Sequence, residues 1–412
     1  MSLTKATYSM IEGAPVNVLD FGAVGDGVAD DTVAIQAAID YCTNLSTRKQ
    51  TLYFPASAPA QYYKVTAPLV ISGRLNIVGD GEFTTLIYGV GLTAGQFILD
   101  FDNEVADNVY FGGISQITIR SNNNTPNAIR LRNTSYWTLK NVQLYGFQTG
   151  IYITGGQCFS NFFEQVTCYQ ISAYSVHMAD FTGGGQYQFL GCTFTGNDGV
   201  FIASTAATDS FALYNCNFEQ CAVTDLYING TVQGLTLSGC RSEGLNGAAS
   251  FLIDPATTKF VRGISITSCF WASDSGNAYP VQIGGSGGNV QGFNISGNYA
   301  GYIGLLAFVN LNGFGEGGVI SGNYCLETPT AKIVTTPRQG VVAFSNYNQT
   351  GLMTDYENLV VLGRAAAAPV SGTYAVGSLV YNSAPTAGGF VGWVCTTAGT
   401  PGTWKTFGAI SA

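Results

Sequence analysis

Through the middle of the chain, apolar and polar residues alternate in short runs, and each run ends at a glycine or a small polar residue. Four successive runs carry apolar residues at every second position: Phe211 and Leu213, Leu235 and Leu237, Ile264 and Ile266, Phe293 and Ile295. A period of two is typical of a β-strand with one buried face. A second alternating stretch follows each run, so each unit is expected to form a strand, a tight bend and another strand.

These units recur at a nearly constant spacing. Cysteine marks the bend in four of them, each 24 residues after the one before: Cys168, Cys192, Cys216 and Cys240. Leu144 lies another 24 residues upstream, and the series continues downstream at looser spacing through Cys269, Asn298 and Asn323. A repeat of this length predicts an all-β fold, a right-handed single-stranded parallel β-helix in which each strand pairs with its copies one coil away. The marker row is expected to face inward, with free cysteines and hydrogen-bonded asparagines.

An acidic pair precedes a short amphipathic segment ahead of the repeats. After the two aspartates at positions 30 and 31, Ile35, Ala38, Ile39 and Cys42 share one face of a helix. Such a helix would cover the end of the solenoid, which otherwise exposes a section of core and an unpaired strand edge. We therefore expect an N-terminal capping helix with the acidic pair at its start.

The same N-terminal segments carry a family resemblance. The run Val16–Gly27 (VNVLDFGAVGDG), the helical segment up to Cys42 and the run Thr51–Pro55 (TLYFP) are followed by β-helical coils. Together they resemble the pectate-lyase-like superfamily as it occurs in bacteriophage tailspikes and capsule depolymerases, over residues 10–345. The resemblance implies a homotrimer of β-helices fixed to the virion that binds and digests a bacterial surface polysaccharide, capsule or O-antigen. Because this superfamily includes lyases, hydrolases, epimerases and non-enzymatic adhesins, the reaction has to be argued from the site.

The chain divides into four segments. In order, we expect a short N-terminal attachment segment, the pectate-lyase-like β-helix, a linker or transition, and a small C-terminal β module: residues 1–15, 16–345, 346–369 and 370–412. The resemblance implies that the first segment docks to a phage tail or baseplate protein. Trp393 and Trp404 in the last segment suit either trimerisation or glycan binding. A module this small is marginal alone, which favours packing between three chains.

Two glutamates occupy the same outward position in consecutive repeats. Glu219 and Glu243 each lie three residues after a marker cysteine. Neighbouring coils are ~4.8 Å apart, so the two carboxylates are expected roughly 5 Å apart. Glycoside hydrolysis needs one carboxyl group as acid and another as nucleophile or base. Carboxyl groups ~5–5.5 Å apart fit a retaining mechanism, and carboxyl groups ~6.5–9.5 Å apart fit an inverting one. The pair therefore favours an endo-glycosidase, and the sequence leaves both stereochemical outcomes open.

Three more side chains are candidates beside this pair. Asp198 and Asp225 are expected in the turns that follow the neighbouring strands, either as alternative acids or as ordinary turn residues. Arg241 is expected near Glu243 as a counter-charge. The plainer interpretation is that both glutamates are solvated surface residues partly neutralised by this arginine.

Two other functions stay open. A polysaccharide lyase would eliminate across a uronic acid and would need a base such as Arg241, Tyr187 or His177. A receptor-binding tail protein without turnover would use the same stacked surface only to hold the glycan. The two enzymes differ in their products, because only the lyase creates an unsaturated sugar that absorbs ultraviolet light.

Composition narrows the range of partners and cofactors. The chain has 16 Lys and Arg against 25 Asp and Glu, a net charge of −9, so no basic surface for nucleic acid is expected. No apolar run approaches the ~18 residues of a membrane span. Ten cysteines without a CxxC pair, and one histidine, predict neither a metal site nor another cofactor. The family resemblance implies a virion protein that is made in the host cytoplasm and acts at the host cell surface.

Overall fold

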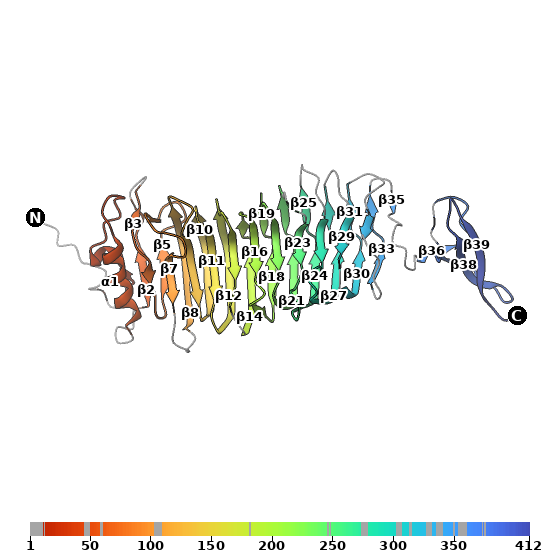
Figure 1. Cartoon of the computed structure of the whole chain (residues 1–412), viewed down its shortest axis with the longest axis horizontal. Coiled ribbons are helices and arrows are strands. Elements are labelled where there is room, and N and C mark those ends of the chain that lie inside the picture. The colour runs from red at the N-terminus through yellow and green to blue at the C-terminus, as the bar shows by residue number, and fades with distance from the viewer. Residues whose placement is uncertain are drawn as a thin grey trace, which may run out of the picture.

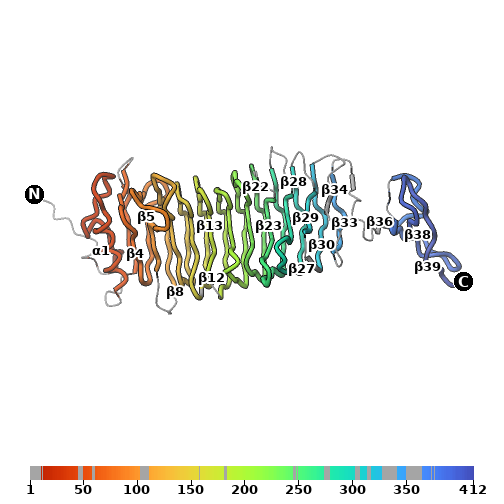
Figure 2. The backbone as a smooth tube through the Cα atoms, in the orientation of Figure 1, coloured from red at the N-terminus to blue at the C-terminus, as the bar shows by residue number. Residues whose placement is uncertain are grey.

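The chain forms an elongated parallel β-solenoid with a helix at its N-terminal end and a small sheet after its last coil (Figure 1). This computed structural model describes residues 11–412 except for the following: 12, 45–49, 58–60, 103–108, 181–182, 245–246, 248, 273–278, 302–306, 313–314, 327–331, 335–340, 349–350, 353–360, 373 and 375. Most of the predicted attachment segment lies outside the described residues. Successive coils stack side by side along the long axis (Figure 2). The predicted parallel β-helix is therefore confirmed.

Each coil contributes to two sheets. One is an 11-stranded parallel sheet: β4 (Leu69–Val70), β7 (Phe97–Asp102), β9 (Asn127–Arg132), β11 (Thr149–Thr154), β13 (Tyr174–Met178), β16 (Asp198–Ile202), β20 (Thr224–Ile228), β23 (Ala249–Ile253), β26 (Tyr279–Ile283), β29 (Ala307–Leu311) and β32 (Lys332–Val334). The other is a 24-stranded sheet, parallel except for its last pairing: β1 (Val16–Asn17), β2 (Thr51–Phe54), β3 (Tyr63–Val65), β5 (Asn76–Gly79), β6 (Leu86–Gly89), β8 (Val109–Ser121), β10 (Thr134–Tyr145), β12 (Gln157–Tyr169), β14 (Gly183–Leu190), β15 (Thr193–Phe194), β17 (Ala207–Thr208), β18 (Phe211–Tyr214), β19 (Asn217–Glu219), β21 (Thr231–Ser238), β22 (Arg241–Glu243), β24 (Phe260–Thr267), β25 (Phe270–Ala272), β27 (Asn289–Ser296), β28 (Tyr299–Ala300), β30 (Gly315–Ser321), β31 (Tyr324–Cys325), β33 (Val341–Phe344), β34 (Tyr347–Asn348) and β35 (Gly351–Leu352).

A residue with left-handed backbone makes the bend within the large sheet. Its φ angle lies between 51° and 66° in ten coils: Gln116, Asn141, Gln165, Gly191, Asn215, Gly239, Ser268, Gly297, Gly322 and Ser345. Glycine adopts this conformation without strain and asparagine tolerates it, whereas a β-branched residue would be strained. The bends therefore stay in line from coil to coil, and the residue after each of them points into the core.

The register corrects two members of the predicted marker row. Thr167 pairs with Thr193, so Val166 and not Cys168 lies level with Cys192. The corrected row runs through the following side chains: Val142, Val166, Cys192, Cys216, Cys240, Cys269, Asn298, Asn323 and Asn346. The two predicted members that leave it, Leu144 and Cys168, pair with each other two positions further along the strands.

A longer turn causes this shift. Tyr174 pairs with Asp198 in the small sheet, so the connection from Thr167 to Tyr174 is two residues longer than the aligned connection from Thr193 to Asp198. The spacing between these coils in the large sheet is therefore 26 residues, as in the pairing of Thr167 with Thr193. Equal spacing of cysteines along the chain does not require equal position in the coil.

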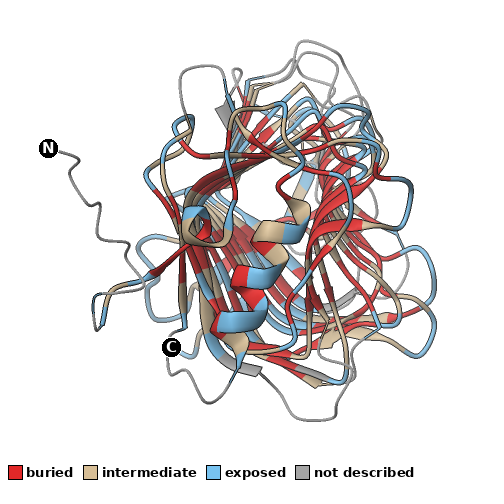
Figure 3. Ribbon diagram, turned by 90° about the vertical axis from the view of Figure 1, so that its left-hand side faces the viewer, coloured by how far each residue is buried: buried red, intermediate tan, exposed pale blue. Residues whose placement is uncertain are grey.

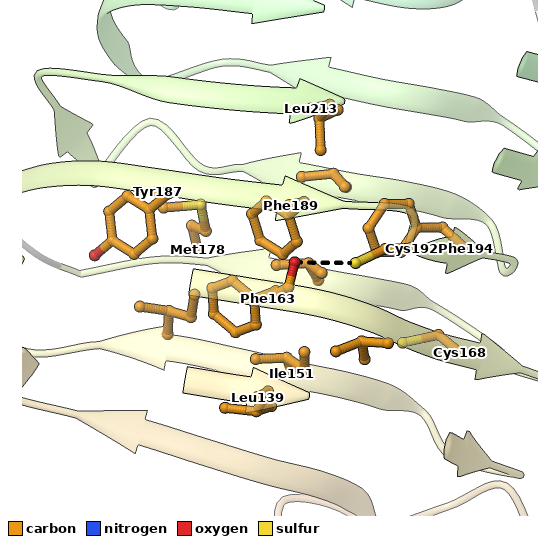
Figure 4. Packing of buried hydrophobic residues seen from close by; sticks show 14 of the residues in the cluster. Leu139, Ile151, Phe163, Cys168, Met178, Tyr187, Phe189, Cys192, Phe194 and Leu213 are labelled. Atoms are coloured by element: carbon orange, nitrogen blue, oxygen red, sulfur yellow. Dashed lines mark hydrogen bonds between the residues drawn. The ribbon is translucent and has the colours of Figure 1, made fainter. Parts of the chain in front are cut away.

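The inward side chains form one continuous apolar core along the solenoid. All ten cysteines are free and buried, including those of the marker row, for which the sequence predicted it. Figure 4 shows Cys192 among stacked aromatic and aliphatic residues, with its thiol donating to the carbonyl oxygen of Phe163 at 3.5 Å. Cys216 and Cys240 donate in the same way to carbonyls of the preceding coil, at 3.5 and 3.4 Å. The thiols therefore act as small apolar side chains with a weak hydrogen bond.

Buried asparagines continue the row as predicted. The Nδ2 group of Asn298 donates to Oδ1 of Asn323 at 2.9 Å, and Asn323 donates to Asn346 at the same distance. The same Nδ2 groups donate to carbonyl oxygens of the preceding coil, and each Oδ1 also accepts a backbone amide. The buried amide groups thus satisfy one another along the solenoid.

Helix α1 (Thr32–Thr43) closes the N-terminal end, after the short 3-10 helix η2 (Val18–Phe21). The four predicted apolar residues of the helix are buried: Ile35, Ala38, Ile39 and Cys42. Figure 3 shows the helix lying across the end of the coils, with buried residues towards the interior. Of the predicted acidic pair, Asp30 accepts a hydrogen bond from the backbone amide of Thr32 at the start of the helix. The Asp31 carboxylate instead accepts two backbone amides of the preceding loop.

A separate four-stranded sheet follows the solenoid: β36 (Val361–Ala365), β37 (Leu379–Asn382), β38 (Phe390–Thr397) and β39 (Thr403–Ala409). Its first strand comes from the stretch expected as a linker. Trp393 is buried and packs edge-on against Phe390, and Trp404 packs edge-on against Tyr374. Both tryptophans therefore contribute to packing within this module.

Candidate functional site

Outward side chains that follow the bend of each coil form two neighbouring rows, which we call the outer strip. The register of the large sheet gives the first row: Thr118, Gln143, Thr167, Thr193, Asn217, Arg241, Phe270, Tyr299, Tyr324 and Tyr347. The second row lies two residues further along each strand: Tyr88, Arg120, Tyr145, Tyr169, Thr195, Glu219, Glu243 and Ala272. Residues between the rows point into the core.

The two glutamates are direct neighbours in the second row. Glu219 pairs in register with Glu243 between β19 and β22, as their spacing predicted. Each carboxylate also has a partner from the first row of its own coil. Asn217 donates from Nδ2 to Glu219 Oε1 at 2.5 Å, and Arg241 Nη1 forms an ion pair with Glu243 Oε2 at 2.6 Å. Arg241 is thus the counter-charge that the sequence indicated, and the two acids stand in different surroundings.

Aromatic rings flank the carboxylate pair on both sides. On the N-terminal side, Tyr145 and Tyr169 stack with ring centroids 5.8 Å apart. On the C-terminal side, Phe270 stacks on Tyr299 at 5.4 Å, and Tyr299 stacks on Tyr324 at 5.5 Å. The outer strip therefore combines flat apolar surfaces with a central acidic pair over many coils.

Two hollows lie along the N-terminal half of the strip. The first, of about 460 Å³, is lined mainly by polar residues, among them Glu219, Gln220, Asn197 and Tyr169. The second hollow, of about 500 Å³, is lined by residues that include Tyr169 and Arg120. Because Tyr169 lines both, the hollows adjoin, and one of them reaches a predicted catalytic side chain.

The structure corrects the predicted positions of the two aspartates. Asp198 begins β16 and Asp225 lies within β20, so both belong to the small sheet and neither lies in a turn. Asp198 is buried and accepts a hydrogen bond from the hydroxyl of Thr224. Burial raises its pKa, an effect that the Thr224 hydroxyl partly opposes.

Asp225 lies deeper than Asp198. It is 0% exposed, and burial raises its pKa to about 7, although the hydroxyl of Ser242 and the thiol of Cys221 oppose the rise. Ser242 is the inward residue between Arg241 and Glu243. Asp225 therefore lies in the core behind the acidic pair and cannot contact a polymer bound to the outer strip.

Two of the bases considered for a lyase also lie away from the strip. Tyr187 is 0% exposed, and its hydroxyl donates to the carbonyl of Cys158 at 2.9 Å. His177 lies in β13 of the small sheet, and burial lowers its pKa to about 4. Its ring lies 5.0 Å from the ring of Tyr152 and 5.2 Å from that of Phe201, so it is a packed side chain. Arg241 alone of the three lies in the outer strip.

The sequence reasoning missed the N-terminal half of the strip. Tyr145 and Tyr169 are 24 residues apart and follow Leu144 and Cys168 directly, so their spacing signals a shared outward row. Arg120 pairs with Tyr145 at a spacing of 25 residues. Its place in the row follows from the structure, because no cysteine or asparagine marks the bend of that coil.

The structure shows no built metal site within the part of the chain that it describes. No group of three or more His, Cys, Asp and Glu side chains there is arranged to hold a metal ion. Among the same residues, no helix combines the length and apolar character needed to cross a membrane.

Comparison with known proteins gives local sequence matches to a phage tail spike and to a mannuronan epimerase. A stretch of 144 residues, 34% of this chain, is 31% identical to the tail spike protein of Shigella phage Sf6 and covers 23% of that protein. A stretch of 78 residues, 17% of this chain, is 44% identical to the mannuronan C5-epimerase AlgE2 of Azotobacter vinelandii and covers 7% of it. The chain thus spans less than a quarter of the length of these two relatives.

Solved structures share the fold at low sequence identity. The surface adhesin PfbA of Streptococcus pneumoniae superposes with a TM-score of 0.64 at 14% identity, covering 97% of this chain and 100% of that one. The gp42 tailspike of Acinetobacter phage vb_AbaP_AS12 superposes with a TM-score of 0.58 at 13% identity, covering 96% and 82%. At these identities the likeness shows the β-helical fold alone.

A family model described as rhamnogalacturonase A/epimerase, pectate lyase-like, matches residues 15–246. The match begins with the N-terminal motif, includes the capping helix and ends just after the second glutamate of the outer strip. It covers more than half of the 412 residues. The chain therefore belongs to the rhamnogalacturonase A/epimerase family of pectate-lyase-like proteins.

Proposed function

We propose that this protein is a phage tailspike depolymerase that binds a bacterial surface polysaccharide, capsule or O-antigen, and hydrolyses it at internal glycosidic bonds. The observation that carries this proposal is the placement of Glu219 and Glu243 side by side, in the middle of a strip with aromatic stacks on both sides. Stacked aromatic side chains suit the flat faces of sugar rings. A polymer lying along the strip would pass directly over the acidic pair.

The different surroundings of the two glutamates suggest their roles. The Arg241 guanidinium stabilises negative charge on Glu243, so this side chain is the nucleophile. Glu219 has a neutral amide as its partner and lies in a hollow, so it is the general acid. In the first step Glu219 protonates the leaving glycosidic oxygen as Glu243 bonds to the anomeric carbon. Water then attacks that carbon, gives a proton to Glu219 and releases Glu243.

The spacing of the coils favours retention of configuration. Neighbouring strands lie ~4.8 Å apart, close to the ~5–5.5 Å that a retaining pair of carboxyl groups requires. An inverting pair needs ~6.5–9.5 Å, which would require both side chains to turn apart. The product of the first turnover is therefore expected to keep the anomeric configuration of the substrate.

A lyase is the second candidate, because Arg241 lies beside the pair. In that reaction its guanidinium would neutralise the carboxylate of a uronic acid while a base removes the adjacent proton. With Arg241 in that role, the positions of Tyr187 and His177 leave neither of them to act as the base, which is why hydrolysis is preferred.

Attachment and assembly complete the proposal. Similarity to the phage Sf6 tail spike supports a place in the virion tail, from which the protein acts on the host surface. We propose that its N-terminal segment binds a tail or baseplate protein and that three chains associate. Exposed apolar side chains near the last coils support the trimer: Val319, Val342, Phe344 and Tyr347.

The experiment is to incubate the protein with purified capsule and O-antigen polysaccharides of candidate hosts, following chain length and ultraviolet absorbance. Glu219→Gln and Glu243→Gln should each slow fragmentation at least ~100-fold, since each removes a proton-transfer or covalent step. Glu164→Gln, which removes an ion pair with Lys140 outside the strip, is the matched control. Fragmentation with rising absorbance would replace the hydrolase by the lyase. Binding without fragmentation would leave a receptor-binding protein.

A further inference from the structure

Arg120 occupies an unusual place in the outer strip. It is the penultimate residue of β8, it is exposed, and its neighbours in the second row are Tyr88 and Tyr145. The guanidinium carbon lies 4.5 Å from the ring centroid of Tyr145 and 5.8 Å from that of Tyr88. Stacking between two rings holds the plane of the guanidinium while its N–H edges stay available to a ligand.

The charge of Arg120 has no acidic partner within the described residues. Two other cations on the same sheet are neutralised, Lys140 by Glu164 at 3.0 Å and Arg241 by Glu243 at 2.6 Å. Arg262 in β24 resembles Arg120, because it stacks on a ring, Phe260, and has no ion pair among the described residues. The hollow beside Arg120 is lined by aromatic, aliphatic, hydroxyl and amide side chains and contains no carboxylate. Glu82 lines an adjoining hollow instead. Arg120 thus combines an unpaired charge with a place in a hollow of the outer strip.

We propose that this hollow binds an acidic sugar residue of the polysaccharide, with its carboxylate on the guanidinium of Arg120. The proposal rests on the polysaccharide function given above and adds the class of substrate. Arg120 would donate two parallel hydrogen bonds to the carboxylate, which a guanidinium matches in geometry. Gln143 from the first row is placed for sugar hydroxyls, and Tyr169 offers an exposed ring face.

The subsite lies away from the reacting atoms. Arg120 and Glu219 are separated by four coils, roughly 19 Å at the ~4.8 Å strand spacing. Arg120 is therefore a binding residue and not a catalytic one, and its loss should appear in affinity and KM more than in kcat. Losing one charge-assisted contact should weaken binding by about 10-fold or more.

The test measures binding apart from cleavage. Wild-type protein, Arg120→Gln and Arg262→Gln are titrated with polygalacturonate, alginate, hyaluronan and acidic bacterial capsules, and with the carboxyl-reduced form of each. Arg262 is the matched control, because it is an exposed arginine stacked on Phe260 at 4.1 Å, outside the outer strip. All measurements are repeated in the Glu219→Gln background, so that slow cleavage cannot distort the affinity.

The expected result is that wild type and Arg262→Gln bind an acidic glycan at least about 10-fold more tightly than Arg120→Gln does. On the carboxyl-reduced form of the same glycan the three proteins should bind alike. Equal affinity of Arg120→Gln and wild type for the acidic glycan, or binding of neutral glycans alone, would overturn the acidic subsite. If the wild-type protein binds an acidic glycan through Arg120 but does not cleave it, the acidic subsite stands and the proposed hydrolase activity is rejected.

Discussion

At the scale of single residues, burial separates acids that look equivalent in the sequence. Glu219 and Glu243 lie at the surface with an amide and a guanidinium as partners. Asp225 lies in the core beneath them, where burial makes its charged form costly. Only the first two can meet a polymer, and the third instead makes the stability of the solenoid depend on pH.

The folded state holds the proton of Asp225 up to about pH 7, whereas the unfolded chain releases it near pH 3.8. Asp225 therefore contributes its full stability below about pH 4, and this contribution is lost as the pH rises to about 7 and above. Asp225→Asn should remove that loss. Relative to wild type, the variant should gain up to about 4 kcal/mol in free energy of unfolding between pH 4 and pH 8.

Urea unfolding at several pH values between these limits measures the effect. Asp209→Asn, a change at an exposed aspartate, should follow the wild-type curve. A constant difference between Asp225→Asn and wild type across the pH range would show that Asp225 is not protonated in the folded state.

At the scale of strands and coils, the buried asparagines tie one coil to the next. Asn323 accepts from Asn298 and donates to Asn346, so its side chain serves two neighbours at once. Asn323→Ala would leave the buried backbone amide of Asn298 without its acceptor and would remove the side-chain bonds to Asn298 and Asn346. We expect the free energy of unfolding to fall by about 2–3 kcal/mol.

The matched control for this change is Asn294→Ala in the coil before it, where the side chain is exposed. Chemical denaturation of both variants should show a shift for Asn323→Ala and almost none for Asn294→Ala. Similar midpoints for the two variants would mean that the amide ladder adds nothing to the stability of the solenoid.

The same scale explains what could be predicted from the sequence. Strand alternation, the capping helix and the inward row of cysteines follow from local periodicity, and the Glu219–Glu243 pair was found because both coils have the same length. The predicted place of Cys168 in the marker row was wrong, because two extra residues in the turn before Tyr174 leave the spacing of the cysteines unchanged. That shift also concealed Tyr169, because counting three residues past Cys168 gives Ile171 instead.

Burial in the second sheet could not be predicted in the same way. Asp198 and Asp225 follow strands of the large sheet at distances that a turn would also fit. Their placement depends on where the chain enters the small sheet, which is fixed by packing across the core and not by alternation along the chain. The sequence therefore predicted the surface acids better than the buried ones.

At the scale of the whole molecule, one outward row changes character towards the C-terminal end of the solenoid. It carries Thr236, Ser265 and Asn294 on earlier coils, then Val319 and Val342. Val342 is 51% exposed, and Phe344, two residues along the same strand, is 54% exposed. Neighbouring apolar side chains of this size on a surface suit the proposed contact between chains.

If three chains associate through this patch, changing Val342 and Phe344 to Ser together should lower the assembled mass measured by light scattering to that of one chain. Val70→Ser, at an exposed valine beside the capping helix, should leave the mass unchanged. A trimer that survives the double change would place the contact elsewhere, and a wild-type monomer would remove the proposed assembly.

The constant pitch of the coils has a consequence for the proposed digestion. A polymer held at Arg120 and cut at the glutamate pair is cut at one set distance from the held sugar, because the number of intervening coils is fixed by the covalent chain. The number of coils between the two points would then set the distance from the held sugar to the cut bond, and the digests should contain fragments of a narrow range of lengths. Removing one whole coil between the two points would shorten those fragments by a single step of roughly 4.8 Å.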